Sequence, residues 1–272
     1  MDLLDVIRRR RSVRSFDGRE LSPAHRARLQ ELAAATENPW GLPVTFALLD
    51  GRENGLSSPV ITGTDLWLAG KLRREPHAEE AYGWSFEALL LRAEAELGIG
   101  AVWIAGTLNR GAFEAAMDLG PGEVLPCVSP VGYPAEKMSL RETLMRRGTK
   151  ASERLPFGSL FFDGSFDAPL TPETAGAAEP PLEAVRRAPS AVNRQPWRVI
   201  RAGPAFHFYE KHSRGYVDRT GWDLQKVDLG IGLCHFALAA QALGRRAVFT
   251  LEDPGLPVPE GTEYIGSFLL QD

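Results

Sequence analysis

The sequence reads Leu97-Gly98-Ile99-Gly100-Ala101-Val102-Trp103 and later Leu243-Gly244-Arg245-Arg246-Ala247-Val248-Phe249. Each stretch has the end of an apolar helix, a glycine turn and the start of a short apolar strand. A pattern that returns once in a chain of 272 residues indicates an internal duplication. The sequence around both stretches tests that interpretation.

The elements before each stretch follow the same order. Ser22-Pro23 and Thr171-Pro172 each combine an N-cap residue with proline at the first helical position. Each predicted helix leads into a loop that contains Pro-Trp, and a short apolar strand follows. The first half has strand candidates at 44–49, 66–69, 101–105 and 123–132, and the second half has one at 198–202.

A second helix is predicted in each half. The first has an apolar stripe from Phe86 to Leu97, and the second, at 228–243, is apolar almost all round, which is typical of a helix buried on every side. We therefore predict an α+β fold of two divergent half-repeats, at 1–149 and 170–272, joined by a linker at 150–169 into one compact unit. Coincidence among common α/β elements is the alternative.

The composition is that of a globular protein, with 44% hydrophobic and 24% charged residues. A net charge of -4 disfavours a general nucleic-acid binder. Cys127 and Cys234 suggest neither a disulfide framework nor a zinc motif. Without a secretory signal or an apolar run long enough to span a membrane, we expect a soluble, cytoplasmic protein.

Five arginines fall between Arg8 and Arg14, around Ser12. One interpretation is a solvated basic helix end, since cations are favoured at helix C-termini. The other is an anion site, because guanidinium groups bind phosphate oxygens in a bidentate way and a serine hydroxyl adds a donor.

The segment from Ala188 to Trp197 contains two prolines and the polar residues Ser190, Asn193 and Gln195. As structure, it is a loop between a helix and a strand. As a site, it is a rigid polar edge that could hydrogen-bond a planar ligand, with Trp197 as a packing anchor.

Four motifs together resemble the FMN-dependent nitroreductase family. They are Arg10-Arg11-Ser12-Val13-Arg14-x-Phe16, the stretch from Leu97 to Gly106, Val131-Gly132-Tyr133-Pro134-Ala135-Glu136-Lys137, and Ala188-Pro189-Ser190-Ala191-x-Asn193-x-Gln195-Pro196-Trp197. The resemblance spans most of the chain and implies a nitroreductase-like fold in both halves.

Ordinary members of that family are homodimers that bind FMN with motifs from both subunits. Here one full set of motifs lies in one chain, whereas the reciprocal positions hold Thr36-Glu37-Asn38-Pro39-Trp40 and Arg245-Arg246. The resemblance therefore implies a monomer that imitates the dimer, similar to fused proteins of the putative TM nitroreductase type, with one flavin site.

The resemblance assigns binding roles and no catalytic side chain. Arg10, Ser12 and Arg141 would hold the FMN phosphate, and Arg14 would face the N1 and O2 edge of the ring. The expected cofactor-binding residues are Arg10, Arg11, Ser12, Arg14, Ala105, Gly106, Arg141, Pro189, Ser190, Ala191 and Asn193.

The implied activity is that of an oxidoreductase, with FMN as cofactor and NAD(P)H as co-substrate. A small electron-poor acceptor such as a nitroaromatic or a quinone would follow in a ping-pong sequence, without nucleic-acid or membrane partners. The alternative is a protein that binds or sequesters FMN without turnover. The five histidines form no metal motif, so no metal is expected, and His235 is best interpreted as a buried core residue.

Overall fold

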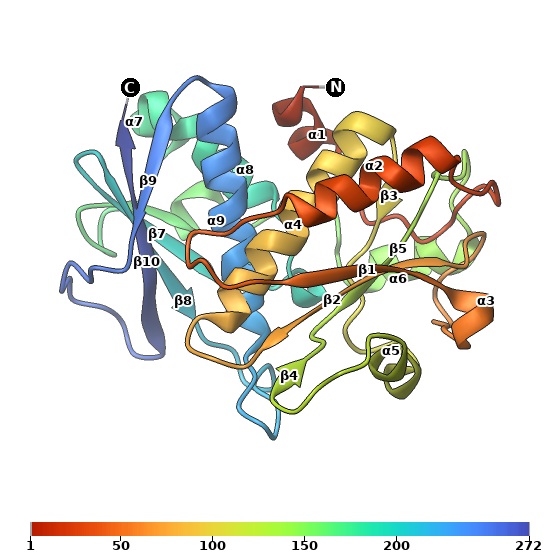
Figure 1. Ribbon diagram of the computed structural model, residues 1–272. Helices are drawn as coiled ribbons and strands as arrows, with labels where there is room; N and C mark the ends of the chain where they lie inside the picture. Colours follow the sequence, from red (N-terminus) through yellow and green to blue (C-terminus); the bar gives the residue numbers. More distant parts are fainter. Residues whose placement is uncertain (1, 272) are drawn as a thin grey trace. The chain divides into compact units, whose positions relative to one another are not determined.

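A computed structural model describes residues 2–271, apart from the side chain of Arg141. The chain divides into two units (Figure 1): unit 1 holds Arg9–Ala151, and unit 2 holds Asp2–Arg8 together with Ser152–Asp272. None of the helices within residues 2–271 combines the length and the apolar character needed to cross a membrane.

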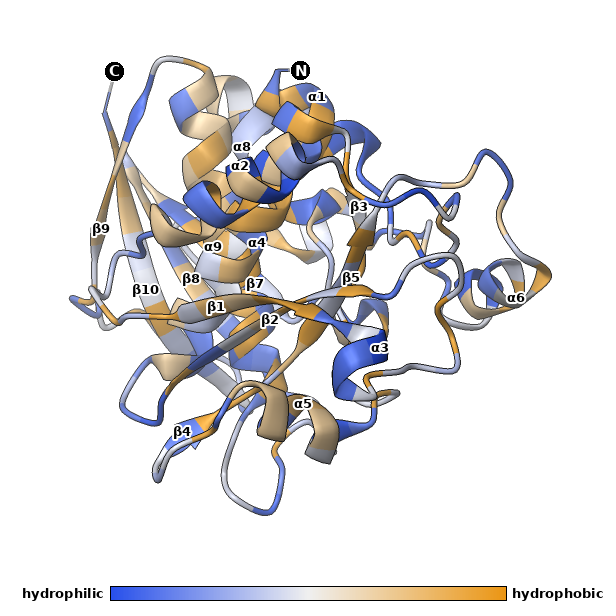
Figure 2. Cartoon of the chain, turned by 45° about the vertical axis from the view of Figure 1, so that its right-hand side comes forward, coloured by the Kyte–Doolittle hydropathy of each residue, from blue (hydrophilic) through white to orange (hydrophobic). Residues whose placement is uncertain are grey.

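Unit 1 is built on a five-stranded sheet in the order β1-β2-β5-β3, with β4 paired to β2. Its strands are β1 (Thr45–Asp50), β2 (Leu66–Arg73), β3 (Gly100–Ala101), β4 (Glu123–Val124) and β5 (Val128–Gly132). Its helices are α2 (Pro23–Ala34), α3 (Gly51–Asn54), α4 (Ala78–Leu97), α5 (Arg110–Ala116) and α6 (Leu140–Gly148). Strands β2 and β5 are largely hydrophobic and buried, as the orange in Figure 2 shows.

Unit 2 contains a second five-stranded sheet in the order β6-β7-β8-β10-β9. Its strands are β6 (Phe161–Asp163), β7 (Trp197–Ala202), β8 (Ala205–Lys211), β9 (Arg246–Thr250) and β10 (Thr262–Gln271). Its helical segments are α1 (Leu3–Arg9, in this unit through Arg8), η1 (Phe157–Ser159), α7 (Pro172–Ala175), η2 (Gly176–Ala178), α8 (Glu179–Arg187), η3 (Ala191–Asn193) and α9 (Leu224–Ala242).

The two sheets confirm the duplication. The order β1-β2-β5-β3 corresponds strand for strand to β7-β8-β10-β9. A helix precedes β1 in unit 1 and β7 in unit 2, the next strand pairs with it antiparallel, and a long helix then leads to the strand at the far edge. These long helices, α4 and α9, are buried over most of their length because each is predominantly apolar. The predicted α+β class is correct.

Several predicted boundaries differ from the structure. The strand expected at 101–105 ends at Ala101, because the Val102 N–H donates to the Ser129 hydroxyl at 3.1 Å and leaves the ladder. The strand expected at 123–132 is two strands, β4 and β5. Pro126 lies between them and has no N–H for a ladder.

The boundaries predicted for the two halves also differ from the structure at two places. The range 150–169, expected to be a linker, contains η1 and β6, because Phe161 is fully buried and pairs in parallel with Val199 of β7. The first residues belong to unit 2, where Val6 and Ile7 of α1 are buried and the Arg8 carbonyl accepts a hydrogen bond from Arg187 Nη1 at 3.3 Å.

Candidate functional site

The arginine segment, residues 10–16 of unit 1, continues from α1 as an extended chain that other motifs hold in place. The Val13 N–H donates to the Ala101 carbonyl at 2.9 Å, next to the glycine turn. The Ala135 N–H donates to the Ser15 carbonyl at 3.0 Å, and Phe16 bridges to Pro134. Three of the four motifs singled out in the sequence therefore meet in unit 1.

Two glycines allow the arginine segment to pack closely against strands β3 and β5. A Cβ on Gly100 would lie 2.9 Å from Val13 Cγ2, and a Cβ on Gly132 would lie 3.0 Å from Phe16 Cδ1. Val13 and Phe16 are buried, so the segment is held by its apolar side chains. The backbone that carries the arginines is therefore fixed.

Buried carboxylates surround these arginines. Glu87 of α4 lies 3.9 Å from Arg10 Nε with its Oε1, and its Oε2 accepts a hydrogen bond from Trp103 Nε1 at 2.7 Å. Glu142 of α6 lies 3.4 Å from Arg11 Nη1. Both carboxylates are almost fully buried, with 1% and 0% of their side chains exposed. The segment is thus not a solvated helix end.

Some guanidinium nitrogens among the described residues of this segment make no hydrogen bond. Among the described residues, Arg10 Nε and Arg14 Nε and Nη1 are buried without a hydrogen bond. Burial lowers the pKa of Arg14, Glu142 opposes that shift, and Arg146 adds to it. Unpaired buried donors are costly, so these atoms are candidate donors to an anion. This observation fits a phosphate group.

The remaining predicted site residues of unit 1 are Ser12, Arg141, Ala105 and Gly106. Ser12 lies half-buried between the arginines, and the side chain of Arg141 lies outside the described part of the chain. Ala105 and Gly106 follow β3, and neither of their N–H groups donates to a backbone carbonyl of a described residue. They are therefore available to an external acceptor.

Glu94 is a further acid near these arginines. It lines a small pocket with Arg10, Arg11 and Glu87. Burial raises the pKa of Glu94 to about 7, Arg10 and Arg11 oppose the shift, and Glu87 adds to it. This carboxyl therefore changes its charge near neutral pH.

We expect Glu94→Gln to be more stable than the parent protein at pH 8 and equally stable at pH 4. The raised pKa means that the fold prefers the protonated acid. The parent therefore loses stability as pH rises from 4.5 to 7, by about 1–2 kcal/mol after allowance for partial exposure. Denaturant unfolding of both proteins across this range measures the difference. Glu75→Gln, at an exposed position before α4, is the control. A constant difference would contradict the assignment.

The loop from Ala188 to Trp197 lies in unit 2 and has an unusual backbone. Val192, Asn193 and Gln195 have φ angles of 50°, 57° and 52°, in the left-handed region. Such a conformation is strained for a β-branched valine. The Ala191 N–H donates to the carboxyl of Asp228 at 3.0 Å, and burial raises the pKa of that carboxyl well above its ordinary value. The loop is therefore held rigidly.

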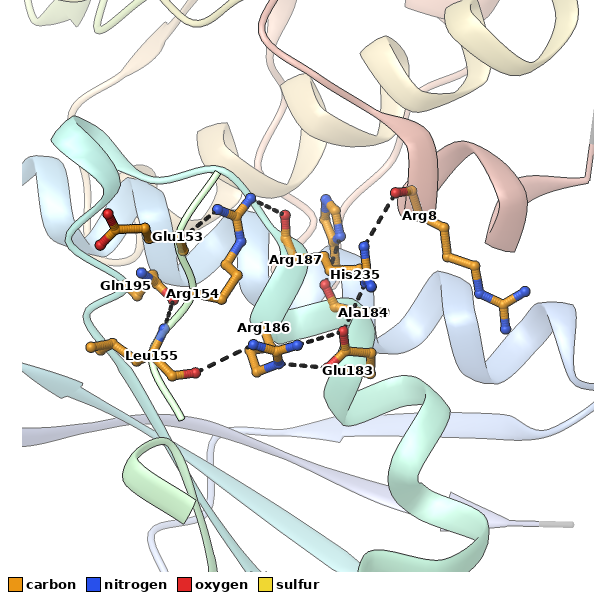
Figure 3. A network of polar contacts seen from close by, with 10 residues as sticks. All are labelled: Arg8, Glu153, Arg154, Leu155, Glu183, Ala184, Arg186, Arg187, Gln195 and His235. Carbon is orange, nitrogen blue, oxygen red and sulfur yellow. Dashed lines mark hydrogen bonds and ion pairs between the residues drawn. The ribbon is translucent and has the colours of Figure 1, made fainter. Parts of the chain in front are cut away.

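The polar side chains of this loop bind the chain around residues 153–155 (Figure 3). Figure 3 shows the first contact, in which Gln195 Oε1 accepts the Leu155 N–H at 3.0 Å. Asn193 Nδ2 also donates to the Glu153 carbonyl at 2.9 Å. Ser190 Oγ accepts the Gln195 N–H at 2.9 Å and keeps its own proton for another acceptor. Much of the polarity of this loop therefore serves its own structure, and Trp197 is a fully buried anchor, as predicted.

Pro189, Ser190, Ala191 and Asn193 thus come together in one loop of unit 2, half-buried. The corresponding loop of unit 1 is different, because Asn38 is used within its own turn, where its amide contacts Leu42 and Ser85. The larger pocket of unit 1, about 290 Å³, is lined by residues such as Arg26 and Asp65 and by none of the predicted site residues.

The histidines show one group that sequence spacing does not indicate. Glu210, His212 and Asp223 of unit 2 place ligand atoms within 4.8 Å of one another. His212 contacts Glu210 at 2.7 Å through Nδ1 and Glu263 at 3.2 Å through Nε2. His235, in α9, is fully buried and contacts the Ala184 carbonyl through Nδ1 at 3.0 Å (Figure 3), as expected of a core histidine.

Comparisons with known proteins identify the family and the fold of the chain. The family model described as "Putative TM nitroreductase" matches residues 2–240, so the chain belongs to that nitroreductase family. A putative nitroreductase from Thermotoga maritima is 21% identical, with a TM-score of 0.62 over 99% of this chain and 94% of that one. A structure described as an oxidoreductase containing FMN is 17% identical, with a TM-score of 0.50 over 61% of this chain and 92% of that one. No curated protein matches the chain.

Membership of this family supports an oxidoreductase in general terms, and the two structural neighbours support the fold. The predicted family and the nitroreductase-like fold are confirmed.

Proposed function

We propose that this protein is an FMN-dependent oxidoreductase that passes reducing equivalents from NAD(P)H to an electron-poor acceptor. The observation that carries the proposal is the set of unpaired buried donors on Arg10 and Arg14, at the point in unit 1 where three family motifs meet. When bound, FMN would supply the hydride chemistry, in a ping-pong sequence with a nitroaromatic or quinone as second substrate.

The residues of the chain would bind and orient this cofactor. Arg10 and Ser12, with Arg141, would hold the phosphate, where guanidinium forks match its oxygens. Arg14 would place a positive charge at the N1 and O2 edge of the ring, because its guanidinium has buried donors to spare. The free N–H groups of Ala105 and Gly106 would donate to the ring.

The loop of unit 2 would contribute shape more than polarity. Pro189, Ser190 and Ala191 would line the ring and the ribityl chain. Asn193, whose amide contacts the Glu153 carbonyl, would act mainly by holding the loop. One flavin per chain and a monomer in solution belong to the same proposal, since only one set of motifs is complete.

The test is anaerobic addition of NADH or NADPH to the FMN-loaded protein. An enzyme of this kind loses its yellow colour, whereas a protein that only binds or sequesters FMN stays yellow. The internal hydrogen bonds of the 188–197 loop are the observation that favours the second function, FMN binding without turnover.

A further inference from the structure

Helix α6, which belongs to unit 1, buries one of its described side chains, and that side chain is an acid. Of the α6 side chains that the structure describes, only Glu142 is buried, whereas Leu140 and Leu144 are 85% and 67% exposed. Figure 2 shows α6 with mixed hydrophilic and hydrophobic residues. A carboxylate is an unusual group to bury on an otherwise exposed helix, since charged groups are buried only when they are paired.

Glu142 lies against the arginine segment. Its Oε2 accepts the Arg14 backbone N–H at 3.3 Å, and its Oε1 lies 3.4 Å from Arg11 Nη1. These contacts are long for charge-assisted hydrogen bonds, which are usually 2.7–2.9 Å. Three buried donors on Arg10 and Arg14 also remain unused. The Glu142 carboxylate therefore satisfies only some of the hydrogen-bond donors of the arginine segment.

The first turn of α6 holds this carboxylate in place. Ser139 Oγ accepts the Glu142 N–H at 3.1 Å and caps the helix. The Ser139 N–H donates to the hydroxyl of Ser15, in the arginine segment, at 3.0 Å. Two single hydrogen bonds are a modest attachment, worth about 1 kcal/mol each, so the turn can be displaced.

We propose that Glu142 is a built-in competitor of the FMN phosphate, which occupies the arginine segment in the free protein and leaves it when the flavin binds. This inference rests on the proposed function. A phosphate has more charge and more acceptor oxygens than a carboxylate, so it binds arginines more strongly, and the unused Nε of Arg10 is a donor that Glu142 does not reach. Repulsion between two anions in the same segment favours the departure of Glu142. The affinity for phosphorylated flavin is then set by the strength of the Glu142 contact.

The test is the affinity of Glu142→Gln for FMN and for riboflavin, which has no phosphate. If Glu142 occupies the segment in about 90% of free molecules, its removal tightens FMN binding about tenfold. Riboflavin binding changes less than FMN binding, because Arg14 is the one residue among the described contacts of Glu142 that the proposed function places at the ring. Glu136→Gln removes the same charge from an exposed position and should leave both affinities as they are.

A second variant tests the same idea with the charge retained. Ser139→Ala removes the cap that holds Glu142 and should tighten FMN binding about fourfold, because a loss of about 1 kcal/mol lowers the occupancy by Glu142 from about 90% to about 60%. Unchanged or weaker FMN binding in both variants, with riboflavin bound as before, would overturn the inference. Loss of binding of both flavins by the parent protein would instead contradict the proposed function. In that case inorganic phosphate, measured by its effect on thermal unfolding, should still stabilise Glu142→Gln more than the parent, and an equal effect would overturn the inference.

Discussion

Arg10→Ala is expected to weaken FMN binding by about 10- to 150-fold and to leave riboflavin binding unchanged. The basis is the buried Nε of Arg10, which has no hydrogen-bond partner among the described residues. A hydrogen bond to a charged group contributes about 1.5–3 kcal/mol, which corresponds to that range of affinity. Quenching of flavin fluorescence by the protein measures both dissociation constants.

Arg9→Ala is the matched control, since Arg9 is exposed and carries the same charge. A long-range effect of net charge would weaken FMN binding equally in both variants. If Arg10→Ala bound FMN as tightly as the parent, the phosphate would have to lie elsewhere. Equal losses for FMN and riboflavin would place Arg10 at the ring.

Gly63→Ala is expected to destabilise the protein by about 3–4 kcal/mol. Gly63 has a φ of 82°, and a Cβ there would lie 2.1 Å from the Phe16 carbonyl oxygen. The left-handed backbone costs an alanine about 1 kcal/mol, and overpacking against a fixed backbone adds up to about 3 kcal/mol. Neighbouring Thr62 exchanges backbone hydrogen bonds with Arg14 and Phe16, so the arginine segment should loosen as well.

Thermal unfolding measures this effect, and the expected fall in Tm is about 6–15 °C. Gly111→Ala is the control, because a Cβ at Gly111 meets nothing within 4 Å and alanine favours the helix α5. FMN affinity at a temperature where the variant is folded should also fall. A Tm within 2 °C of the parent would show that the turn at Gly63 adapts freely.

The duplication could be predicted from the sequence because it depends on local signals. Cap-proline pairs such as Thr171-Pro172 and the all-round apolar character of 228–243 each report on a nearby segment. Strand order depends on partners that are distant in the chain, and no local pattern shows that β10 lies between β8 and β9. The structure of 150–169 was missed for the same reason, since β6 gains its stability from pairing with β7.

The arginine segment could be predicted as a site, but its acidic neighbours could not. Glu87 and Glu94 are seven residues apart on α4 and so share one face of the helix, yet acids on a helix are usually solvated. Glu142 stands three residues after Ser139, a spacing that indicates a helix start. Only the folded chain brings that start beside Arg11 and Arg14.

The most direct test of the central claim is the visible spectrum of the FMN-loaded protein during anaerobic titration with NADH and then NADPH. We predict one FMN per chain, with loss of the oxidised flavin absorbance on addition of at least one nucleotide. Its return on addition of a quinone or a nitroaromatic is also expected. Arg10→Ala at the same FMN concentration should retain less flavin. A protein that binds no FMN, or that binds it and stays oxidised with both nucleotides, would contradict the assignment as an FMN oxidoreductase.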